Sequence, residues 1–209
     1  SDGGASLVKP IPDDWENVAV SELEDDGLTR CAWANGSQMM RTYHDEEWGC
    51  PIVGEQDMFE RLSLEAFQAG LSWATILRKR PAFREAFRDF DLEYCAGLTD
   101  ADIEELMGNE GIIRARAKIE ATRSNAAATI ALREEGGLEG LIGSFVPERM
   151  PEPANQSEVP TSSPESTNLA RELRAHGFRF VGPTNMYALM EASGLVNTHL
   201  TSCFRRDQV

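Results

Sequence analysis

The chain has 209 residues, of which 41% are hydrophobic and 26% charged, a composition typical of a globular protein and not of a disordered or collagen-like chain. Its net charge of -15 argues against a protein that coats nucleic acid through charge alone. No stretch of 18 residues lacks a charge, and no basic segment followed by an apolar one opens the chain. We therefore expect neither a membrane helix nor a secretion signal, and a cytoplasmic location.

Acidic residues are concentrated near the beginning of the chain. Eight of the first 30 residues are acidic and two are basic. We expect residues 1–28 to form an acidic, loosely ordered extension, in which a short helix within residues 15–23 is the one regular element. The folded domain is then expected over residues 29–209.

Helical patterns follow one another through the middle of the chain. Apolar residues at near-helical spacing predict a helix from Glu55 onward, which Gly70 interrupts. Ser72 is the expected N-cap of the next helix, and Pro81 is expected to end that helix or to begin another segment. Thr99, with Asp102 three residues later, predicts a capped helix that ends at residue 108.

The second half of the chain continues the helical pattern. We predict helices over residues 112–133, 138–145, 166–176 and 183–193, the third of them capped by Ser166 and closed by Gly177. Five of the ten prolines lie between residues 147 and 164, which predicts a long loop there. Alternating strand patterns are nearly absent, so the predicted fold class is all-α.

A short glycine-containing turn joins two of these helices within the sequence LMGNEGIIRARAKI (106–119). Free amides of the turn at Gly111 and of the following helix would form an anion site, and Arg114, Arg116 and Lys118 add positive charge beside it. Such a hairpin binds the DNA backbone and does not read bases. On these residues alone, an ordinary helical hairpin with a solvated basic face explains the pattern equally well.

Glu65 stands among apolar residues in LEAFQAGLSW (64–73), so its carboxylate is expected at the edge of the core or inside a pocket. Trp33, Tyr43 and Trp73 provide aromatic surface in nearby segments. Aromatic walls with one carboxylate suit a flat, cationic or amino-bearing ligand, which stacks on the rings and donates N–H bonds to the carboxylate. Spacing alone favours the alternative, in which the aromatic residues belong to the core and Glu65 forms a cap or a salt bridge.

Four residues near the two ends of the predicted domain have side chains that bind metals. Cys31 and His44 lie near its beginning, and His199 and Cys203, four positions apart, near its end. Two thiolates and two imidazoles suit a tetrahedral zinc ion with no open position, which is a structural site. Plain buried thiols and a core histidine are the alternative reading of the same residues.

Together these segments resemble the DNA-3-methyladenine glycosylase I family. The resemblance runs in order from about residue 30 to about residue 204. The YHDEEWG and LE-QAGLSW strings are its most specific parts. The matching strings are RCAW (30–33), YHDEEWG (43–49), LEAFQAGLSW (64–73), GIIRARAKI (111–119), IGSF (142–145), PTS (160–162), GFRFVG (177–182) and GLVN with His199 (194–199).

The resemblance implies an all-α fold of the helix–hairpin–helix DNA glycosylase superfamily. It implies one structural Zn2+, joining the N- and C-terminal segments of the domain and held by Cys31, His44, His199 and Cys203. It also implies a base pocket in which Glu65 and Tyr43 bind the methylated adenine, Trp73 stacks on it and Trp33 helps to close the pocket.

The activity implied is base excision. The enzyme flips 3-methyladenine out of alkylated double-stranded DNA, hydrolyses its N-glycosidic bond and releases free 3-methyladenine. Because a cationic base departs as a neutral molecule, Glu65, the expected catalytic residue, is assigned mainly to recognising the base, with stabilisation of the sugar as a second role. The pocket motifs contain no lysine, so no strand-cleaving lyase activity is expected. We expect a monomer and no membrane partner.

Three positions depart from the family pattern. Ala66 stands where the family usually has glycine, Phe67 where a small or polar residue is common, and Met40 where some members have a tyrosine. These changes leave open a second reading, a non-enzymatic module of the same fold that binds alkylated DNA or the free base.

Overall fold

The computed structural model describes residues 25–209, and within that range it contains helices and loops but no strand, in agreement with the predicted fold class. The predicted short helix within residues 15–23 lies outside the described residues. The α-helices are α1 (Gln38–Glu46), α2 (Glu55–Gln68), α3 (Trp73–Ala86), α4 (Leu92–Ala96), α5 (Asp100–Gly108), α6 (Arg116–Leu132), α7 (Gly137–Gly143), α8 (Pro164–Ala175) and α9 (Pro183–Ala192). Short 3-10 helices are η3 (Ala32–Gly36), η4 (Arg133–Glu135), η5 (Gln156–Glu158) and η6 (Arg206–Gln208).

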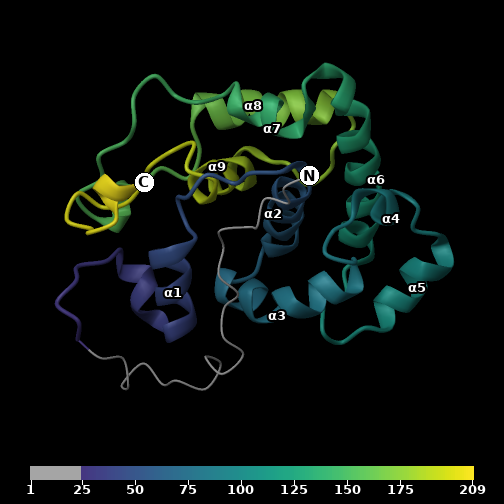
Figure 1. Cartoon of the computed structure of the whole chain (residues 1–209), viewed down its shortest axis with the longest axis horizontal. Coiled ribbons are helices and arrows are strands. Elements are labelled where there is room, and N and C mark those ends of the chain that lie inside the picture. Colours follow the sequence, from purple (N-terminus) through teal and green to yellow (C-terminus); the bar gives the residue numbers. More distant parts are fainter. Residues whose placement is uncertain (1–24) are drawn as a thin grey trace, which may run out of the picture.

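Helix α2 lies at the centre of the molecule (Figure 1). It packs against α3, α6, α7 and α9, and all ten residues from Met58 to Phe67 are buried. On one side of it lie α1 and the C-terminal segment, and on the other side lie α4, α5 and α6 (Figure 1). A charged residue in the middle of α2 is therefore placed deep in the protein, between two groups of helices.

A cluster of fully buried phenylalanines packs α2 against α3 and the segment that follows it. Phe67 lies 4.6 Å from Phe83, measured between ring centroids, and Phe87 lies 5.3 Å from Phe90. Such tilted and stacked ring pairs stabilise a core beyond the area they bury. The departure at Phe67 is thus a core residue, which fixes the position of the helix and does not line a cavity.

Local capping signals predicted several helix boundaries correctly. The Ser72 side chain accepts a hydrogen bond from the amide of Thr75, and Thr99 forms a capping box with Asp102. The predicted cap at Ser166 is wrong, because α8 begins earlier, at Pro164. Ser163 is the N-cap and Ser166 is the third helical residue of its capping box. Proline suits the first helical position, which explains why the helix begins there.

Pro81 does not end or reset its helix as predicted, since α3 runs continuously from Trp73 to Ala86. A proline inside a helix removes one backbone hydrogen bond. Here Leu77 and Arg80, on one side of Pro81, and Phe83, on the other, are all buried. Packing of these side chains outweighs the local preference.

The helix after the hairpin begins at Arg116, not at residue 112, so the connection from α5 spans residues 109–115. The Asn109 side chain accepts a hydrogen bond from the Gly111 amide, and Lys79 donates to the carbonyl of Gly111. Side-chain bonds of this kind hold the backbone in an irregular turn. A Cβ at Gly111 would lie 2.8 Å from that of Ala82, so this position accepts only glycine against α3.

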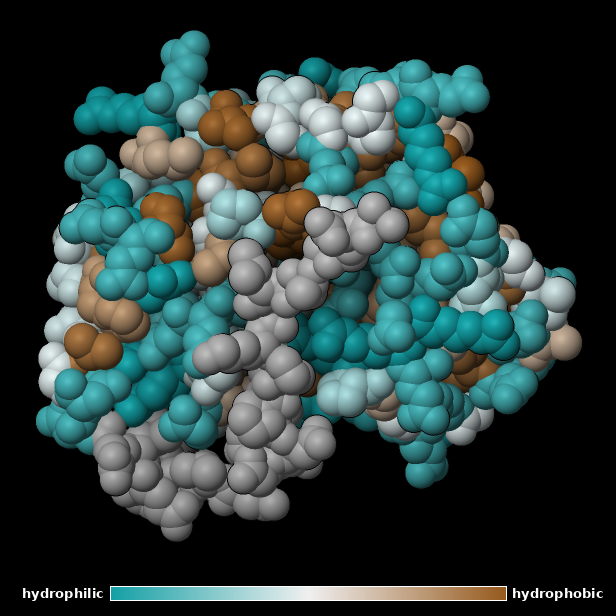
Figure 2. Space-filling view, viewed as in Figure 1, coloured by the Kyte–Doolittle hydropathy of each residue, from teal (hydrophilic) through white to brown (hydrophobic). Residues whose placement is uncertain are grey.

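The viewed face of the molecule is mostly hydrophilic, as the net charge suggests, and its hydrophobic side chains gather mainly toward α7 and α8 (Figure 2). Among residues 25–209, no helix has the length and apolar character needed to cross a membrane. The sequence did not predict α1 or the five-residue α4, both of which are short.

Candidate functional site

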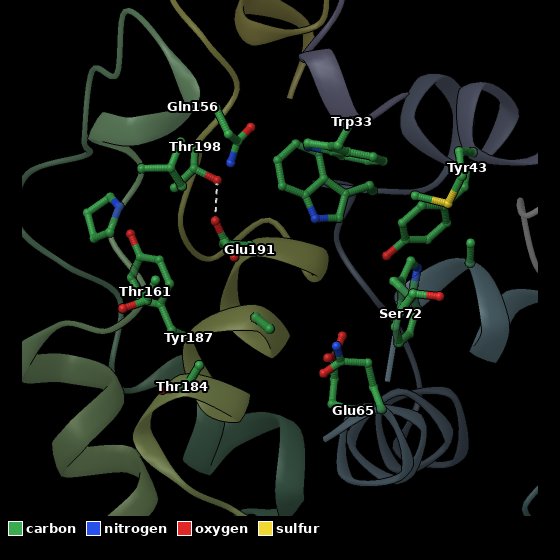
Figure 3. A pocket seen from close by; sticks show the side chains of 18 residues that line it. Trp33, Tyr43, Glu65, Ser72, Gln156, Thr161, Thr184, Tyr187, Glu191 and Thr198 are labelled. Atoms are coloured by element: carbon green, nitrogen blue, oxygen red, sulfur yellow. Dashed lines mark hydrogen bonds between the residues drawn. The ribbon is translucent and has the colours of Figure 1, made fainter. Parts of the chain in front are cut away.

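A cavity of about 570 Å³ lies between α1, α2, α3, α9 and the loop before α8. The structure brings all four predicted base-binding residues to its wall, namely Trp33, Tyr43, Glu65 and Trp73. They come from four different elements, η3, α1, α2 and α3. Figure 3 shows Trp33, Tyr43 and Glu65 on one side of this space. The aromatic residues are thus a cavity wall and not only core, as the alternative reading of the sequence had them.

Glu65 is 4% exposed and receives no hydrogen bond from any side chain among the described residues. Burial raises the pKa of its carboxyl group to about 7; the positive charge of Arg61 opposes this shift, and the negative charge of Glu191 adds to it. A buried carboxylate without a hydrogen-bonding partner is costly. Its retention in a cavity points to a ligand that supplies the missing donors and positive charge.

Tyr43 is fixed by Arg61, which comes from the turn of α2 before Glu65. The Arg61 guanidinium donates to the Tyr43 hydroxyl oxygen and also pairs with Glu47. Its central carbon lies 5.3 Å from the centroid of the Tyr43 ring and 5.2 Å from that of Trp73. Because the hydroxyl oxygen accepts from Arg61, the hydroxyl proton of Tyr43 is directed elsewhere and can be donated to a ligand.

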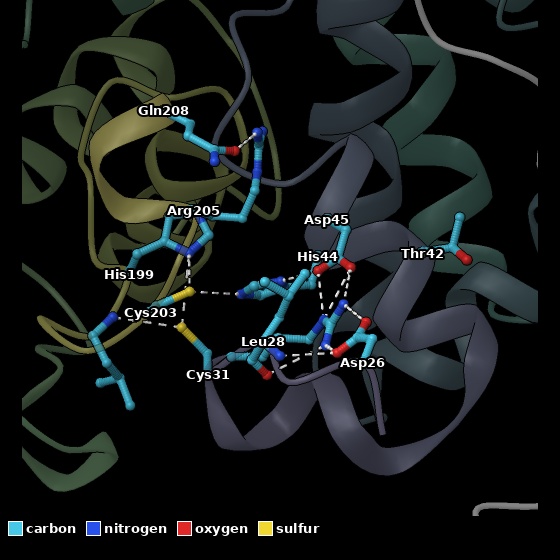
Figure 4. A network of polar contacts seen from close by, with 12 residues as sticks. Asp26, Leu28, Cys31, Thr42, His44, Asp45, His199, Cys203, Arg205 and Gln208 are labelled. Carbon is cyan, nitrogen blue, oxygen red and sulfur yellow. Dashed lines mark hydrogen bonds and ion pairs between the residues drawn. The ribbon is translucent and has the colours of Figure 1, made fainter. Parts of the chain in front are cut away.

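The predicted metal ligands form one buried cluster. The ligand atoms of Cys31, His44, His199 and Cys203 all lie within 4.8 Å of one another, and all four residues are buried. The Cys203 Sγ atom lies 3.4 Å from both His44 Nε2 and His199 Nδ1 (Figure 4). Tetrahedral zinc, with Zn–N and Zn–S bonds of about 2.0 and 2.3 Å, separates such atoms by about 3.5 Å. The donor set and its spacing therefore fit this metal.

An ion-pair network supports the cluster from one side. The His44 Nδ1 atom lies 2.7 Å from Asp45 Oδ1, and Arg30 donates to both Asp45 and Asp26 (Figure 4). A carboxylate on the far ring nitrogen fixes the tautomer of a ligating histidine, here with Nε2 directed at the site. The first described residues are thereby tied to α1 and to the metal cluster.

Aromatic contacts join the metal cluster to the cavity. The Trp48 ring lies 4.5 Å from that of His199, and the Trp33 ring lies 5.2 Å from that of His44, measured between centroids. Both tryptophans also line the cavity. Two of the predicted metal ligands, His44 and His199, thus support one wall of the cavity.

The predicted phosphate-binding residues of the hairpin differ in their surroundings. Arg114 and Arg116 are exposed on the surface, where they pair with Glu110 and Glu104. The Gly111 amide is engaged by Asn109, as described above. The Lys118 ammonium donates to the backbone carbonyls of Phe67 and Ala69, each at 2.9 Å. The structure therefore gives Lys118 an internal contact at the end of α2, which the sequence did not indicate.

Sequence reasoning missed several cavity residues. Glu191 of α9 lines the cavity opposite Glu65, and the Thr198 hydroxyl donates to its carboxylate (Figure 3). A single acid in the apolar stretch NMYALMEA (185–192) was the signal that could have identified it. Arg61, which binds Tyr43 but does not line the cavity, was also missed. Its position one helical turn before Glu65 was the signal that could have identified it.

The three residues that depart from the family pattern, Met40, Ala66 and Phe67, lie in different parts of the structure. Met40 lines the cavity, whereas Ala66 is buried and, like Phe67, is not part of its lining. Pocket shape is thus altered directly at Met40 only.

Comparisons with known proteins agree on one family. A family model described as methyladenine glycosylase matches residues 33–206. The DNA-3-methyladenine glycosylase of Haemophilus influenzae is 42% identical over 178 residues, which cover 84% of this chain and 96% of that protein. DNA-3-methyladenine glycosylase 1 of Escherichia coli is 39% identical over 179 residues, with the same two shares.

Solved structures of similar proteins have the same fold. A crystal structure of 3-methyladenine DNA glycosylase I has a TM-score of 0.81 at 42% identity, over 84% of this chain and 98% of that one. A variant of 3-methyladenine DNA glycosylase I crystallised in complex with 3-methyladenine has a TM-score of 0.79 at 33% identity, over 85% and 97% of the two chains.

Proposed function

The chain belongs to the methyladenine glycosylase family, and we propose that the aromatic cavity is where it binds and releases the damaged base. The protein is a base-excision enzyme that hydrolyses the N-glycosidic bond of 3-methyladenine in alkylated DNA. The observation that supports the cavity as the site is the presence of Glu65, Tyr43 and Trp73 on its wall, with the Glu65 carboxylate buried and without a hydrogen-bond donor.

In this proposal, recognition uses the positive charge and the amino group of the methylated base. The base stacks on Trp73 while Trp33 closes the cavity, Tyr43 donates a hydrogen bond, and the Glu65 carboxylate accepts from the exocyclic amine. Normal adenine is neutral and gains less from a buried carboxylate. Since the cationic base leaves as a neutral molecule, no strong acid has to protonate it.

The DNA must present the base outside the duplex, because the cavity lies within the protein. Flipping costs a few kcal/mol, and less for a damaged pair. We assign the contacts with the DNA backbone to the basic hairpin. Arg114 and Arg116 exchange their acidic partners for phosphates. Gly111 allows the tight turn of the hairpin, and Lys118 holds the helix that follows it against the end of α2. Surface ion pairs are weak, so exchanging these partners costs little free energy. The lining of the cavity contains no lysine that could form a Schiff base, so we propose hydrolysis without lyase chemistry. We also propose that the protein acts as a monomer on double-stranded DNA.

We assign the cluster of Cys31, His44, His199 and Cys203 to one structural Zn2+. The ion would supply no chemistry to the reaction, because all four positions of a tetrahedral site are filled by the protein. Its effect would be to fasten the segment before α1 to the segment after α9, and so to hold Trp33 and Trp48 in the cavity wall.

Release of free base from methylated duplex DNA, followed by chromatography, tests this function. We expect the wild type to release 3-methyladenine, and Glu65→Gln and Trp73→Ala to release far less. Glu134→Gln, an exposed acid-to-amide change on η4, is the matched control and should behave as wild type. A folded wild type that binds methylated DNA without releasing base would instead indicate a binding module.

A further inference from the structure

The cavity contains two carboxylates, and base recognition uses only one of them. Glu65 comes from α2 and Glu191 from α9, and both line the same space. No salt bridge joins either of them to a cation within residues 25–209. Burial raises the pKa of the Glu191 carboxyl group to about 7, and the hydrogen bond from Thr198 opposes the shift. Two acids in one cavity repel each other, so the second carboxylate is costly and indicates a function of its own.

The two carboxylates stand on chemically different walls. Tyr43 lies on the side of Glu65, whereas Gln156, Tyr187 and Thr198 lie with Glu191 on the other side of the cavity, each with an amide or hydroxyl group (Figure 3). Aromatic surface suits the flat base. Amide and hydroxyl groups suit a deoxyribose and a water molecule, because both need hydrogen-bond partners.

The two carboxylates also lie at different depths. Glu65 is buried at 4% exposure, whereas Glu191 has intermediate exposure and therefore lies nearer to solvent. A flipped nucleotide enters base first, because its sugar remains attached to the DNA backbone outside. The base then reaches Glu65, and the sugar stays at the level of Glu191.

Thr198 fixes the orientation of Glu191. Its hydroxyl donates to Glu191 Oε1 at 2.5 Å, and Thr198 itself is 2% exposed. Within residues 25–209, no other side chain donates to this carboxylate. One oxygen is thus held while the other remains available to the cavity, as a group that positions water requires.

We propose that Glu191 is a second catalytic residue, whose carboxylate faces the deoxyribose and accepts the proton of the attacking water. This inference rests on the glycosylase function given above. The bond between C1′ and the base nitrogen breaks, and its electron pair leaves with the base and neutralises the positive charge. The oxocarbenium sugar, stabilised by the negative carboxylate, gains the water oxygen at C1′. The water proton passes to Glu191 and from there to solvent.

The test separates chemistry from base recognition. The rate of base release is measured in single turnover on methylated duplex DNA, and binding of free 3-methyladenine is measured by calorimetry. We expect Glu191→Gln to slow release by about 100-fold, the lower range for a positioned general base, and to leave the affinity for free base within about twofold of wild type. Thr198→Val should slow release less, because the carboxylate remains but is no longer held. Glu134→Gln again serves as the control.

Two results would overturn this assignment. Release by Glu191→Gln at the wild-type rate would show that the carboxylate has no part in the reaction. A loss of free-base affinity as large as the loss of rate would make Glu191 a second recognition group. Melting temperature and zinc content, measured on each variant, separate these results from misfolding, and Glu191→Asp repeats the test with a shorter carboxylate if the amide variant is unfolded. Failure of the wild type to release base would contradict the glycosylase function itself.

Discussion

The ammonium group of Lys118 donates a hydrogen bond, 2.9 Å long, to the backbone carbonyl of Ala69, the residue that caps the end of the helix carrying Glu65. A second bond of the same length reaches the carbonyl of Phe67. A cation at the end of a helix satisfies carbonyls that have no partner within the helix and opposes the negative end of its dipole. Helix α6 and the helix that carries Glu65 are thus joined by the side chain of Lys118.

Lys118→Met should therefore reduce stability as well as function. It leaves carbonyls at the end of α2 without their donor, which costs about 1–3 kcal/mol for buried groups. We expect a lower midpoint of urea unfolding and weaker binding of free 3-methyladenine, because the end of α2 loses its anchor. Arg114→Met is the matched control, since Arg114 is exposed and this variant should be as stable as the wild type. Unchanged stability of Lys118→Met would show that the two bonds contribute little.

Arg116→Ala should weaken DNA binding without changing the pocket. Arg116 is paired only with the exposed Glu104, at 2.5 Å, among the contacts of the described residues. If it contacts one phosphate, the slope of log affinity against log salt concentration should become shallower by about one. Fluorescence anisotropy at several salt concentrations measures the slope, and calorimetry with the free base should give the wild-type affinity. An unchanged salt slope would place the DNA elsewhere.

Glu65→Gln should bind free 3-methyladenine more weakly than wild type does. The amide keeps the size of the side chain but loses the negative charge and one acceptor oxygen, so its hydrogen bond with the exocyclic amine is weaker. We expect affinity for free 3-methyladenine to fall by about tenfold or more, the worth of one charge-assisted hydrogen bond. Affinity for undamaged duplex DNA, measured beside it, should stay the same. Equal affinities of the variant and wild type for the free base would show that the Glu65 carboxylate makes no charge-assisted hydrogen bond to it.

The same two acids make stability depend on pH. The pKa of both Glu65 and Glu191 is raised to about 7, so the folded protein binds more protons than the unfolded chain between the ordinary glutamate pKa of 4.5 and pH 7. Stability therefore falls as pH rises through this window. Each group lowers the free energy of unfolding at pH 8 by at most about 3 kcal/mol.

Replacing either acid by glutamine should remove the contribution of that acid to the loss of stability at high pH. We expect Glu65→Gln to be more stable than wild type at pH 8, and the difference to shrink toward pH 5, where the wild-type carboxyl is protonated. Thermal unfolding at both pH values measures this difference, with Glu134→Gln as the control. A difference that does not change with pH would show that Glu65 is not held with a raised pKa.

The metal cluster gives a further prediction. Purified protein should contain one zinc ion per chain, and chelation or Cys203→Ser should remove it. Since the ion binds the folded state only, its loss should lower stability by about 3 kcal/mol or more. Cys50→Ser is the matched control, because Cys50 is a free thiol outside the cluster. Elemental analysis and thermal unfolding provide the two readouts, and full stability of metal-free protein would argue against a structural ion.

Features with a local cause could be predicted from the sequence. The capping box of Thr99 and Asp102 depends on residues three positions apart, and so does the cap at Ser72. The start of α6 could not be predicted, because contacts of Lys79 and Ala82, which lie on α3, help to hold the preceding turn. The prediction that Pro81 ends or resets its helix was wrong for the same reason, because packing of its buried neighbours outweighs the local effect of proline.

The candidate site shows the same division. Glu65, Tyr43 and Trp73 stood out because polar and aromatic residues occur there in unusual strings. Glu191 did not, because its importance depends on a helix that lies far away in sequence and crosses the same cavity. The contact of Lys118 with the end of α2 likewise joins positions some 50 residues apart, which no short motif reveals.

The contacts of His199 and Thr198 with the cavity have a consequence for how the protein is made. His199 supports the wall through Trp48, and Thr198 holds Glu191, so both contributions come from the last segment of the chain. During synthesis, Trp33, Tyr43 and Glu65 leave the ribosome long before these residues do. Until then the cavity wall lacks the contacts that Thr198 and His199 provide, so the cavity is complete only after this segment has left the ribosome. A chain cut short by a premature stop codon in α9 would contain every predicted base-binding residue and still lack Thr198 and His199, whose contacts complete the cavity wall.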